Sequence, residues 1–271
     1  MATQPLSEGE FKRELYEKHK EHFDHFYRLH AFAEQSLINS KSLTADSYHS
    51  ALQLILPRAF KSYDAIRRLC EVASCEDAGV VLRSLMNLMA VTRWISLDPQ
   101  KRARRFLDWY WMEMHLIIAD LPPSWAPVIE KRYAQVRSQF EYKNKKGCVR
   151  LVDHWYQPEA NTIRSIFEQV ELEKQYEEGY KILSGVEHSD VTACLAMFAG
   201  AEIAGQERKL AVHSELFLRP YLRNAFQFFA DIFGICNMTL HIADDTRLRE
   251  LVSEGFTFYR ADMQGRGISD T

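Results

Sequence analysis

The first candidate site combines an arginine and an asparagine on one expected helix. Arg83 and Asn87 are four residues apart, so both side chains lie on the same face of a helix predicted over residues 75–96. Nearly every residue from Gly79 to Ile95 is apolar, which predicts a helix surrounded by protein. A guanidinium in a core needs a carboxylate, carbonyl groups or an anionic ligand beside it. The pattern therefore indicates either a structural ion pair or an anion pocket.

The second candidate site is a run of polar residues on a later helix. Tyr180, Ser184 and His188 follow at four-residue spacing, and Glu177 lies about one turn before Tyr180. His188 is expected at the helix C-terminus, where the helix dipole favours the protonated ring, so it is a candidate acid–base or anion-binding group. Ser184 is a weak nucleophile candidate, because a mid-helix serine usually bonds its own i−4 carbonyl and no nucleophile elbow surrounds it.

Two sequence runs resemble a bacterial all-helical family known as a domain of unknown function. These runs are LRSLMNLMAVTRWI and, about a hundred residues later, YKILSGVEHSD. In that family an Arg-Ser/Thr pair opens a buried helix, and a Tyr-x3-Ser-x3-His stretch closes another. The resemblance covers about residues 60 to 190 and implies an all-helical fold without implying an activity. By position it points to five residues: Arg83, Ser84, Tyr180, Ser184 and His188.

Position 87 departs from that family, which often has Glu where this chain has Asn87. If the family's Glu neutralises the arginine, another group must neutralise Arg83 in this chain. Glu177 is a candidate for this role. The expected site therefore joins the helix of Arg83 to the helix of Tyr180.

Four histidines, His19, His22, His25 and His30, occur near the N-terminus among acidic residues. His22 and His25 have a spacing that metal ligands on a helix use. A di-metal bundle needs matching Glu-x-x-His motifs on facing helices, and residues 172–187 contain none. We therefore expect a half-exposed helix face and no metal or other cofactor.

Two short segments match the R-x(4–6)-H pattern of HEPN ribonucleases, a class found in bacterial toxins and phage-defence systems. The segments are Arg13 to His19 and Arg208 to His213. A chain with this many Arg and His residues produces about two such matches by chance. The pattern keeps a ribonuclease as the alternative hypothesis and does not favour it.

Basic residues form two clusters: Lys101, Arg102, Arg104 and Arg105, and then Lys143, Lys145, Lys146 and Arg150. The first cluster lies at the start of an expected helix, where cations oppose the helix dipole unless they meet an anion. A solvated helix face and a solvated loop are the simpler interpretation, and contact with nucleic-acid phosphates is the alternative.

Composition sets limits on the protein class. The 271 residues carry a net charge of −3, which does not resemble the strong positive charge of a dedicated nucleic-acid binder. The five cysteines are widely spaced and form no C-x-x-C motif, which predicts reduced thiols in a cytoplasmic protein. The N-terminus lacks an apolar signal-peptide core, and the apolar stretch from Ala225 to Leu240 is too short and polar to span a bilayer.

Helical periodicity predicts an all-α bundle of about eight to nine helices in one domain, residues 1–261, followed by a disordered tail, 262–271. A loop is expected over 143–161 and a small β-hairpin near 202–212. The predicted helices cover about 7–38, 44–72 with a kink or break at Pro57, 75–96, 98–121, 123–142, 162–170, 172–186, 220–242 and 245–260.

The functional prediction is a cytoplasmic binding or regulatory module with an anion pocket around Arg83 and His188. A small anion or a nucleotide is the expected ligand, and no membrane contact is expected. In the ribonuclease alternative, RNA is the partner, His188 is the acid–base group, and Arg83 stabilises phosphate charge. The sequence leaves open whether the protein is an enzyme and whether it forms a homo-oligomer.

Overall fold

The fold was examined in a computed structural model, which describes residues 7–40, 46–181, 183–184, 215 and 217–265. Helices make up 81% of the structure, and the described residues form one two-stranded antiparallel sheet. The predicted all-α class with a small hairpin is confirmed. The hairpin expected near 202–212 falls outside the described residues, and the observed sheet lies elsewhere in the chain.

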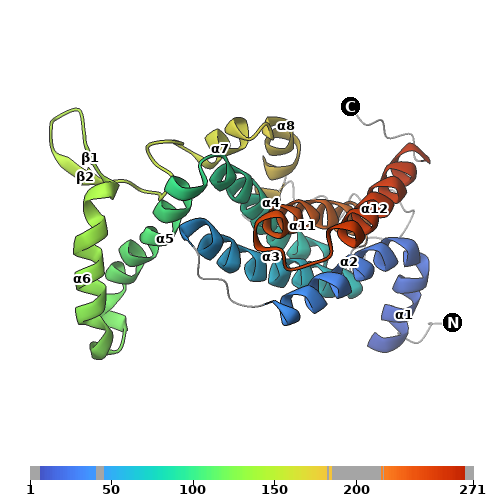
Figure 1. The fold of residues 1–271 in the computed structure, drawn as a ribbon. Helices are drawn as coiled ribbons and strands as arrows, with labels where there is room; N and C mark the ends of the chain where they lie inside the picture. Colours follow the sequence, from blue (N-terminus) through green and yellow to red (C-terminus); the bar gives the residue numbers. More distant parts are fainter. Residues whose placement is uncertain (1–6, 41–45, 182, 185–214, 216, 266–271) are drawn as a thin grey trace.

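Three long helices pack against one another at the centre of the body: α3 (Ser47–Glu71), α4 (Cys75–Leu97) and α11 (Leu218–Leu240). Helices α2 (Lys20–Asn39) and α12 (Asp245–Gly265) pack against α11 and against each other (Figure 1). Stacked rings join α2, α3 and α11, with Tyr63 3.8 Å from Phe26 and 4.4 Å from Phe229 between ring centroids. These buried aromatic contacts fix the frame on which the site is built.

The N-terminal segment forms two helices where the sequence predicts one. Ser7 and Glu10 form a capping box at the start of α1 (Glu8–Lys18). The chain then leaves helical geometry at His19, which ends α1 and precedes α2. The break has a physical reason, because the buried His19 ring contacts Glu215 and Arg219 instead of continuing a helix face.

Pro57 does not break α3, which runs through it from Ser47 to Glu71. The proline lies on the exposed side of the helix, while Ala51, Leu52 and Ile55 are buried. Water can therefore reach the carbonyl group that proline leaves without a donor, and packing on the buried side keeps the helix continuous.

The helix predicted over 75–96 is confirmed as α4, but it is not surrounded by protein on all sides. Leu82, Met86 and Met89 are buried, whereas Ser84 is exposed and Val80 is half-buried. Among the described residues α4 alone is long and apolar enough to cross a membrane, judged by length and composition. Its packing against α3 and α11 is that of a core helix.

A helical arm projects from the body (Figure 1). It has its own small core of Met112, Val136, Phe140 and Val152. Its elements in chain order are α5 (Pro99–Leu116), η1 (Ile118–Asp120), η2 (Pro123–Trp125), α6 (Ala126–Val136), η3 (Arg137–Phe140), β1 (Glu141–Lys143) and β2 (Val149–Leu151).

The arm corrects two sequence predictions. The helix expected over 123–142 gives way to strand at Glu141, and the loop expected from residue 143 contains the second strand. Tyr142 pairs with Arg150 across this hairpin. The turn depends on Gly147, whose φ of 76° is left-handed, and on the Asn144 side chain, which accepts hydrogen bonds from two backbone amides.

After the arm, α7 (Ile163–Gln169) lies within the helix predicted over 162–170, and Thr162 is its N-cap. The helix expected over 172–186 starts as α8 (Glu173–Gln175) and becomes a π-helical turn, η4 (Tyr176–Tyr180). At the C-terminus α12 continues to Gly265, beyond residue 262 where the sequence predicts a disordered tail.

Candidate functional site

Arg83 and Tyr180, predicted to share a site, are in direct contact. The Arg83 Nη2 donates a 2.7 Å hydrogen bond to the Tyr180 hydroxyl, and the guanidinium carbon lies 4.6 Å from the ring centroid. Tyr180 is buried, whereas Arg83 is half-buried, which corrects the expectation of a fully buried guanidinium. The Arg83 guanidinium thus contacts both the ring face and the hydroxyl of Tyr180, and these contacts link α4 to η4.

The π-helical turn positions Tyr180. Its ring stacks on Tyr176 at 4.9 Å, and Phe167 of α7 lies 5.7 Å away between centroids. Gly179 brings the turn close to α4, because a Cβ at this position would lie 3.3 Å from Met86 Cε. π-Helical turns recur at functional sites, where they change the direction of a side chain within a helix.

The other predicted residues have separate surroundings. Ser84 is exposed and bonds the Val80 carbonyl of its own helix, and Ser184 is half-buried. The Asn87 Oδ1 atom is buried without a hydrogen-bond partner in the part of the chain that the structure describes. His188 lies outside the described residues, so its distance from Arg83 is untested.

Glu177, the predicted partner of Arg83, contacts other cations. It forms an ion pair with Lys181 on the next helical turn and a second, at 3.2 Å, with Arg164 of α7. The hydrogen bond from Lys181 lowers the pKa of the Glu177 carboxyl. Among the described residues of η4, the group that accepts a hydrogen bond from Arg83 is the Tyr180 hydroxyl.

A cavity of about 740 Å³ adjoins this contact, between η4, α11 and α12. Met86 and Gly179 line it, each within one helical turn of the Arg83–Tyr180 pair. Its charged lining residues are three cations and one carboxylate: Lys174, Arg223, Arg260 and Glu178. The lining of this basic cavity therefore has more cationic than anionic residues.

A second cavity, of about 550 Å³, lies next to the first. The two share four lining residues: Gln175, Gln227, Phe228 and Phe256. In the second cavity Arg93 and Asp231 form a bidentate ion pair, with N–O distances of 2.6 and 2.8 Å. The hydrogen bonds that Arg93 donates to Asp231 raise the pKa of Arg93, so this pair remains charged and internally neutralised.

The α11 and α12 residues that line these two cavities were not among the site residues predicted from the sequence. A signal was present, because Arg223, Gln227 and Asp231 recur every four residues in an otherwise apolar helix. Such a polar stripe on one face indicates a solvated groove or a polar neighbour. The stripe alone did not show that α12 leaves space beside it, which depends on the path of the chain after Leu240.

The N-terminal histidines are more buried than predicted. His19 is 6% exposed and His22 is 4% exposed, which overturns the expected half-exposed face for these two. Arg219 Nε donates to His19 Nδ1 at 2.9 Å, so His19 Nε2 carries the proton and donates to Glu215 at 3.0 Å. Burial lowers the pKa of both histidines, and His22 lies 3.2 Å from Asp262.

These contacts join α1, α2, α11 and α12 and do not assemble the R-x-H pattern. Arg13 is exposed, whereas His19 is buried against Arg219. Within the described residues no group of three His, Cys, Asp or Glu side chains is arranged to hold a metal ion. The second match, Arg208 to His213, lies outside the described residues.

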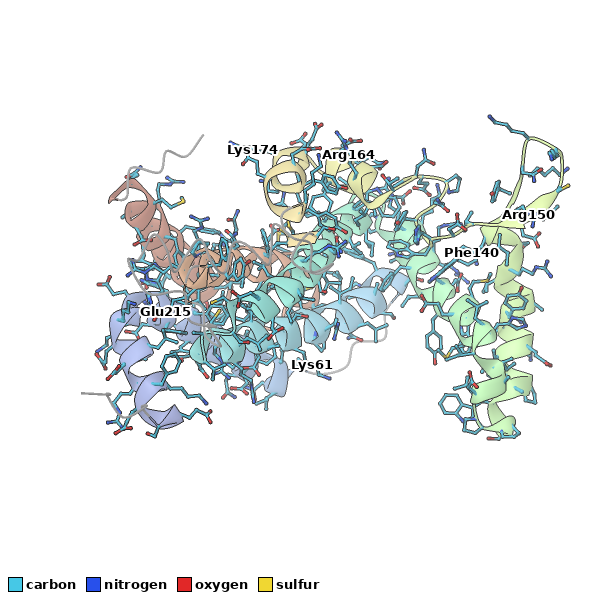
Figure 2. The ribbon with its side chains drawn as sticks, turned by 180° about the vertical axis from the view of Figure 1, so that it is seen from behind. Lys61, Phe140, Arg150, Arg164, Lys174 and Glu215 are labelled. Carbon is cyan, nitrogen blue, oxygen red and sulfur yellow. The ribbon has the colours of Figure 1, made fainter. Side chains whose placement is uncertain are left out.

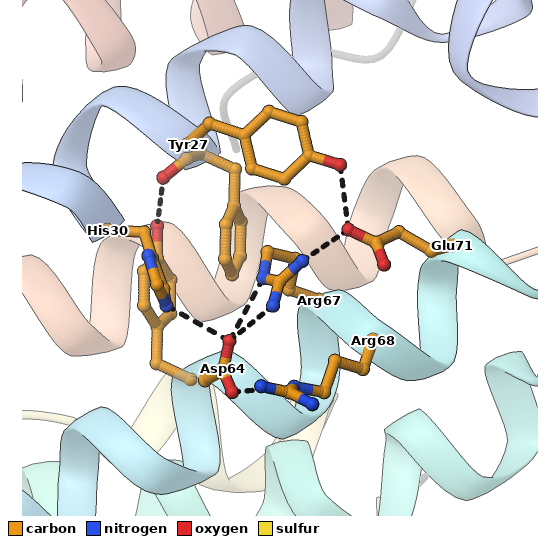
Figure 3. A network of polar contacts seen from close by, with 8 residues as sticks. Tyr27, His30, Asp64, Arg67, Arg68 and Glu71 are labelled. Carbon is orange, nitrogen blue, oxygen red and sulfur yellow. Dashed lines mark hydrogen bonds and ion pairs between the residues drawn. The ribbon is translucent and has the colours of Figure 1, made fainter. Parts of the chain in front are cut away.

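A further polar network joins α2 to α3 (Figure 3). Asp64 accepts hydrogen bonds from His30, Arg67 and Arg68, and Glu71 accepts from Tyr27 and Arg67. Each carboxylate is matched by donors on the same or the facing helix. Both carboxylates accept hydrogen bonds from members of the network, so we interpret it as an inter-helix clamp.

A family model described as a family of unknown function (DUF5677) matches residues 49–202. Searches of the curated proteins and of the solved structures gave no match. The matched segment includes both Arg83 and Tyr180 and ends before α11. Because the match spans more than half of the 271 residues, the chain belongs to this family of unknown function.

Proposed function

We propose that the protein is a binding module that holds a small anion in the basic cavity between η4, α11 and α12. The observation that carries this proposal is the lining, in which Lys174, Arg223 and Arg260 face one carboxylate, Glu178. A cavity of this size accommodates a phosphate group and a small organic substituent. The Arg83–Tyr180 contact supports the wall of the cavity.

A concave shape focuses the field of the three cations, which come from different elements. Lys174 is on α8, Arg223 on α11 and Arg260 on α12. An anion bound among them would therefore hold three segments together. That coupling suits a regulatory module, because occupancy would stabilise the packing of α12.

Calorimetric titration with methyl phosphate and with adenosine monophosphate tests the proposal. We expect binding that weakens about tenfold in Arg260→Gln, since a charge-assisted hydrogen bond contributes roughly 1.5–3 kcal/mol. Arg247→Gln is the matched control, because Arg247 is an exposed cation on the same helix outside the cavity. The proposal is wrong if no phosphate monoester binds or if Arg260→Gln leaves binding unchanged.

The ribonuclease alternative has no supporting observation in the described residues, because its second motif and His188 lie outside them. A cleavage assay on a labelled single-stranded RNA separates it from the binding module. RNA cleavage by the wild type that is lost in His188→Ala would favour the ribonuclease.

A further inference from the structure

The groove formed by the two cavities is long and follows one face of α11. Lining residues run from Arg223 to Met238, which are 15 positions apart and correspond to roughly 22 Å at 1.5 Å per residue. The opposite wall is formed by one face of α12, from Leu248 to Met263. A groove of this length exceeds what a single phosphate group would fill.

Charge is distributed unevenly along this groove. The end near Arg223 and Arg260 has an excess of cations in its lining, as described above. At the other end Arg93 pairs with Asp231, and Arg249 lies 3.7 Å from Asp245. The remaining charged lining residue there, Glu171, is exposed. One end therefore favours an anion and the other does not.

Apart from these charged residues, the end of the groove near Met238 is mainly apolar. Its lining includes Met89, Leu172, Ile235, Leu248 and Val252. Two further lining residues are large and exposed, with Met238 67% and Phe256 40% accessible to solvent. Exposed apolar side chains in a concave site favour an apolar ligand, and methionine adapts its shape to such ligands.

We infer that the groove binds an elongated amphiphile with an anionic head, of the long-chain alkyl phosphate or carboxylate class. The head lies among Lys174, Arg223 and Arg260, and the hydrocarbon chain passes Phe228 and Phe256 toward Met238. Phe228 and Phe256 line both cavities, so they join the basic end to the apolar end. The position of the anionic head rests on the proposed function, and the position of the hydrocarbon chain goes beyond it.

The test compares two ligands that share a head and differ in chain. Decyl phosphate, used below its critical micelle concentration, should bind on the order of 100-fold more tightly than methyl phosphate, since each buried methylene contributes and the groove is partly open. Decyltrimethylammonium has the same chain and a cationic head, and it should bind far more weakly than decyl phosphate.

The substitution Met238→Glu tests the position of the hydrocarbon chain of the ligand. It should weaken decyl phosphate binding about tenfold, because it places a charge at the apolar end, and leave methyl phosphate binding unchanged. Leu54→Glu is the matched control, since Leu54 is 61% exposed on α3, outside the groove. Decyl phosphate binding that Met238→Glu does not change would overturn the inference.

The remaining outcomes separate the two proposals. Equal affinity for methyl and decyl phosphate would leave the anion site standing and overturn the amphiphile. If no phosphate monoester binds, both proposals are wrong. If decyltrimethylammonium binds as tightly as decyl phosphate, the chain alone is recognised and the basic end has no role.

Discussion

The two basic clusters of the arm differ in what their cations contact. At the start of α5, Glu159 pairs with Lys101 at 2.8 Å and with Arg102 at 3.1 Å. Arg104 lies 3.7 Å from Asp108, and Arg105 donates to the carbonyl groups of three residues: Gln139, Trp155 and Gln157. Each cation of this root cluster therefore has a described acceptor.

The hairpin cluster of Lys143, Lys145, Lys146 and Arg150 is different. All four side chains are exposed, and in the described portion of the chain none of them forms an ion pair. Figure 2 shows Arg150 on the projecting arm, whereas Arg164 and Lys174 lie on the body. The hairpin therefore presents uncompensated positive charge to solvent.

Both clusters consist of Lys and Arg, so the surroundings of each side chain, and not its residue type, decide whether its charge forms structural contacts. Apart from Arg104, the cations of the root cluster contact carbonyl and carboxylate groups of residues 139–159, so their charges hold the start of α5 to the chain that returns from the arm. The hairpin cluster meets water, so its charges contribute to the field around the protein and little to stability.

The largest expected effect is at Arg105. Arg105→Met keeps most of the apolar stem and leaves three carbonyl groups without their donor, besides removing the contact of the guanidinium with Phe140 at 4.4 Å. We expect the free energy of unfolding to fall by about 3 kcal/mol. Urea denaturation measures this change.

Arg104→Met is the matched control for Arg105→Met. Arg104 is on the same helix, its side chain is 73% exposed, and its ion pair is long. It should change the free energy of unfolding by less than about 0.5 kcal/mol. Equal effects of the two substitutions would show that the root cluster does not anchor the arm.

A smaller effect is expected at Glu159. Glu159→Gln removes the charge that pairs with Lys101 and Arg102 while keeping the shape of the side chain. Because both pairs are partly solvated, the expected loss is about 1 kcal/mol. Urea denaturation at neutral pH gives the value, and an unchanged midpoint would contradict the pairing.

Glu159 also gives the root cluster a pH dependence. Burial raises the pKa of Glu159, but the ion pairs with Lys101 and Arg102 outweigh burial and hold it below its ordinary value of 4.5. The stabilisation is therefore fully present above pH 4.5 and is lost as pH falls through the lowered pKa. The stability difference between wild type and Glu159→Gln should shrink over that acidic range.

The smallest effect on stability is expected in the hairpin. Replacing Lys143, Lys145 and Lys146 together with serine should change the free energy of unfolding by less than about 0.5 kcal/mol. The same variant should elute from a heparin column at lower salt, because the hairpin field is reduced. A variant with serine at Lys20, Lys61 and Arg247 matches the charge change and should retain more heparin affinity.

Local signals predicted much of the helical framework. The apolar run from Gly79 to Ile95 placed α4 correctly, and helical periodicity placed α7 within its predicted range of 162–170. The errors came from tertiary contacts. His19 interrupts a helix because Glu215 and Arg219 hold its ring, and Pro57 fails to interrupt one because it faces solvent.

The candidate site was predictable where local spacing carried the signal and unpredictable where tertiary contacts decided. Spacing and family resemblance linked Arg83 to Tyr180, and the two side chains are in contact. Glu177, a candidate partner of Arg83, instead forms ion pairs with Arg164 and Lys181. The groove combines α4, α8, η4, α11 and α12, and no spacing within one helix shows which cavity separate helices enclose.

The π-helical turn at Tyr176–Tyr180 has a consequence for the evolution of the family. Such a turn accommodates one additional residue without adding a loop, so deletion of one residue would restore a regular α-helix. Every later side chain on that helix would then rotate by about 100°. In relatives of this chain, a one-residue alignment gap near position 178 would therefore mark those in which the tyrosine no longer meets the arginine of α4.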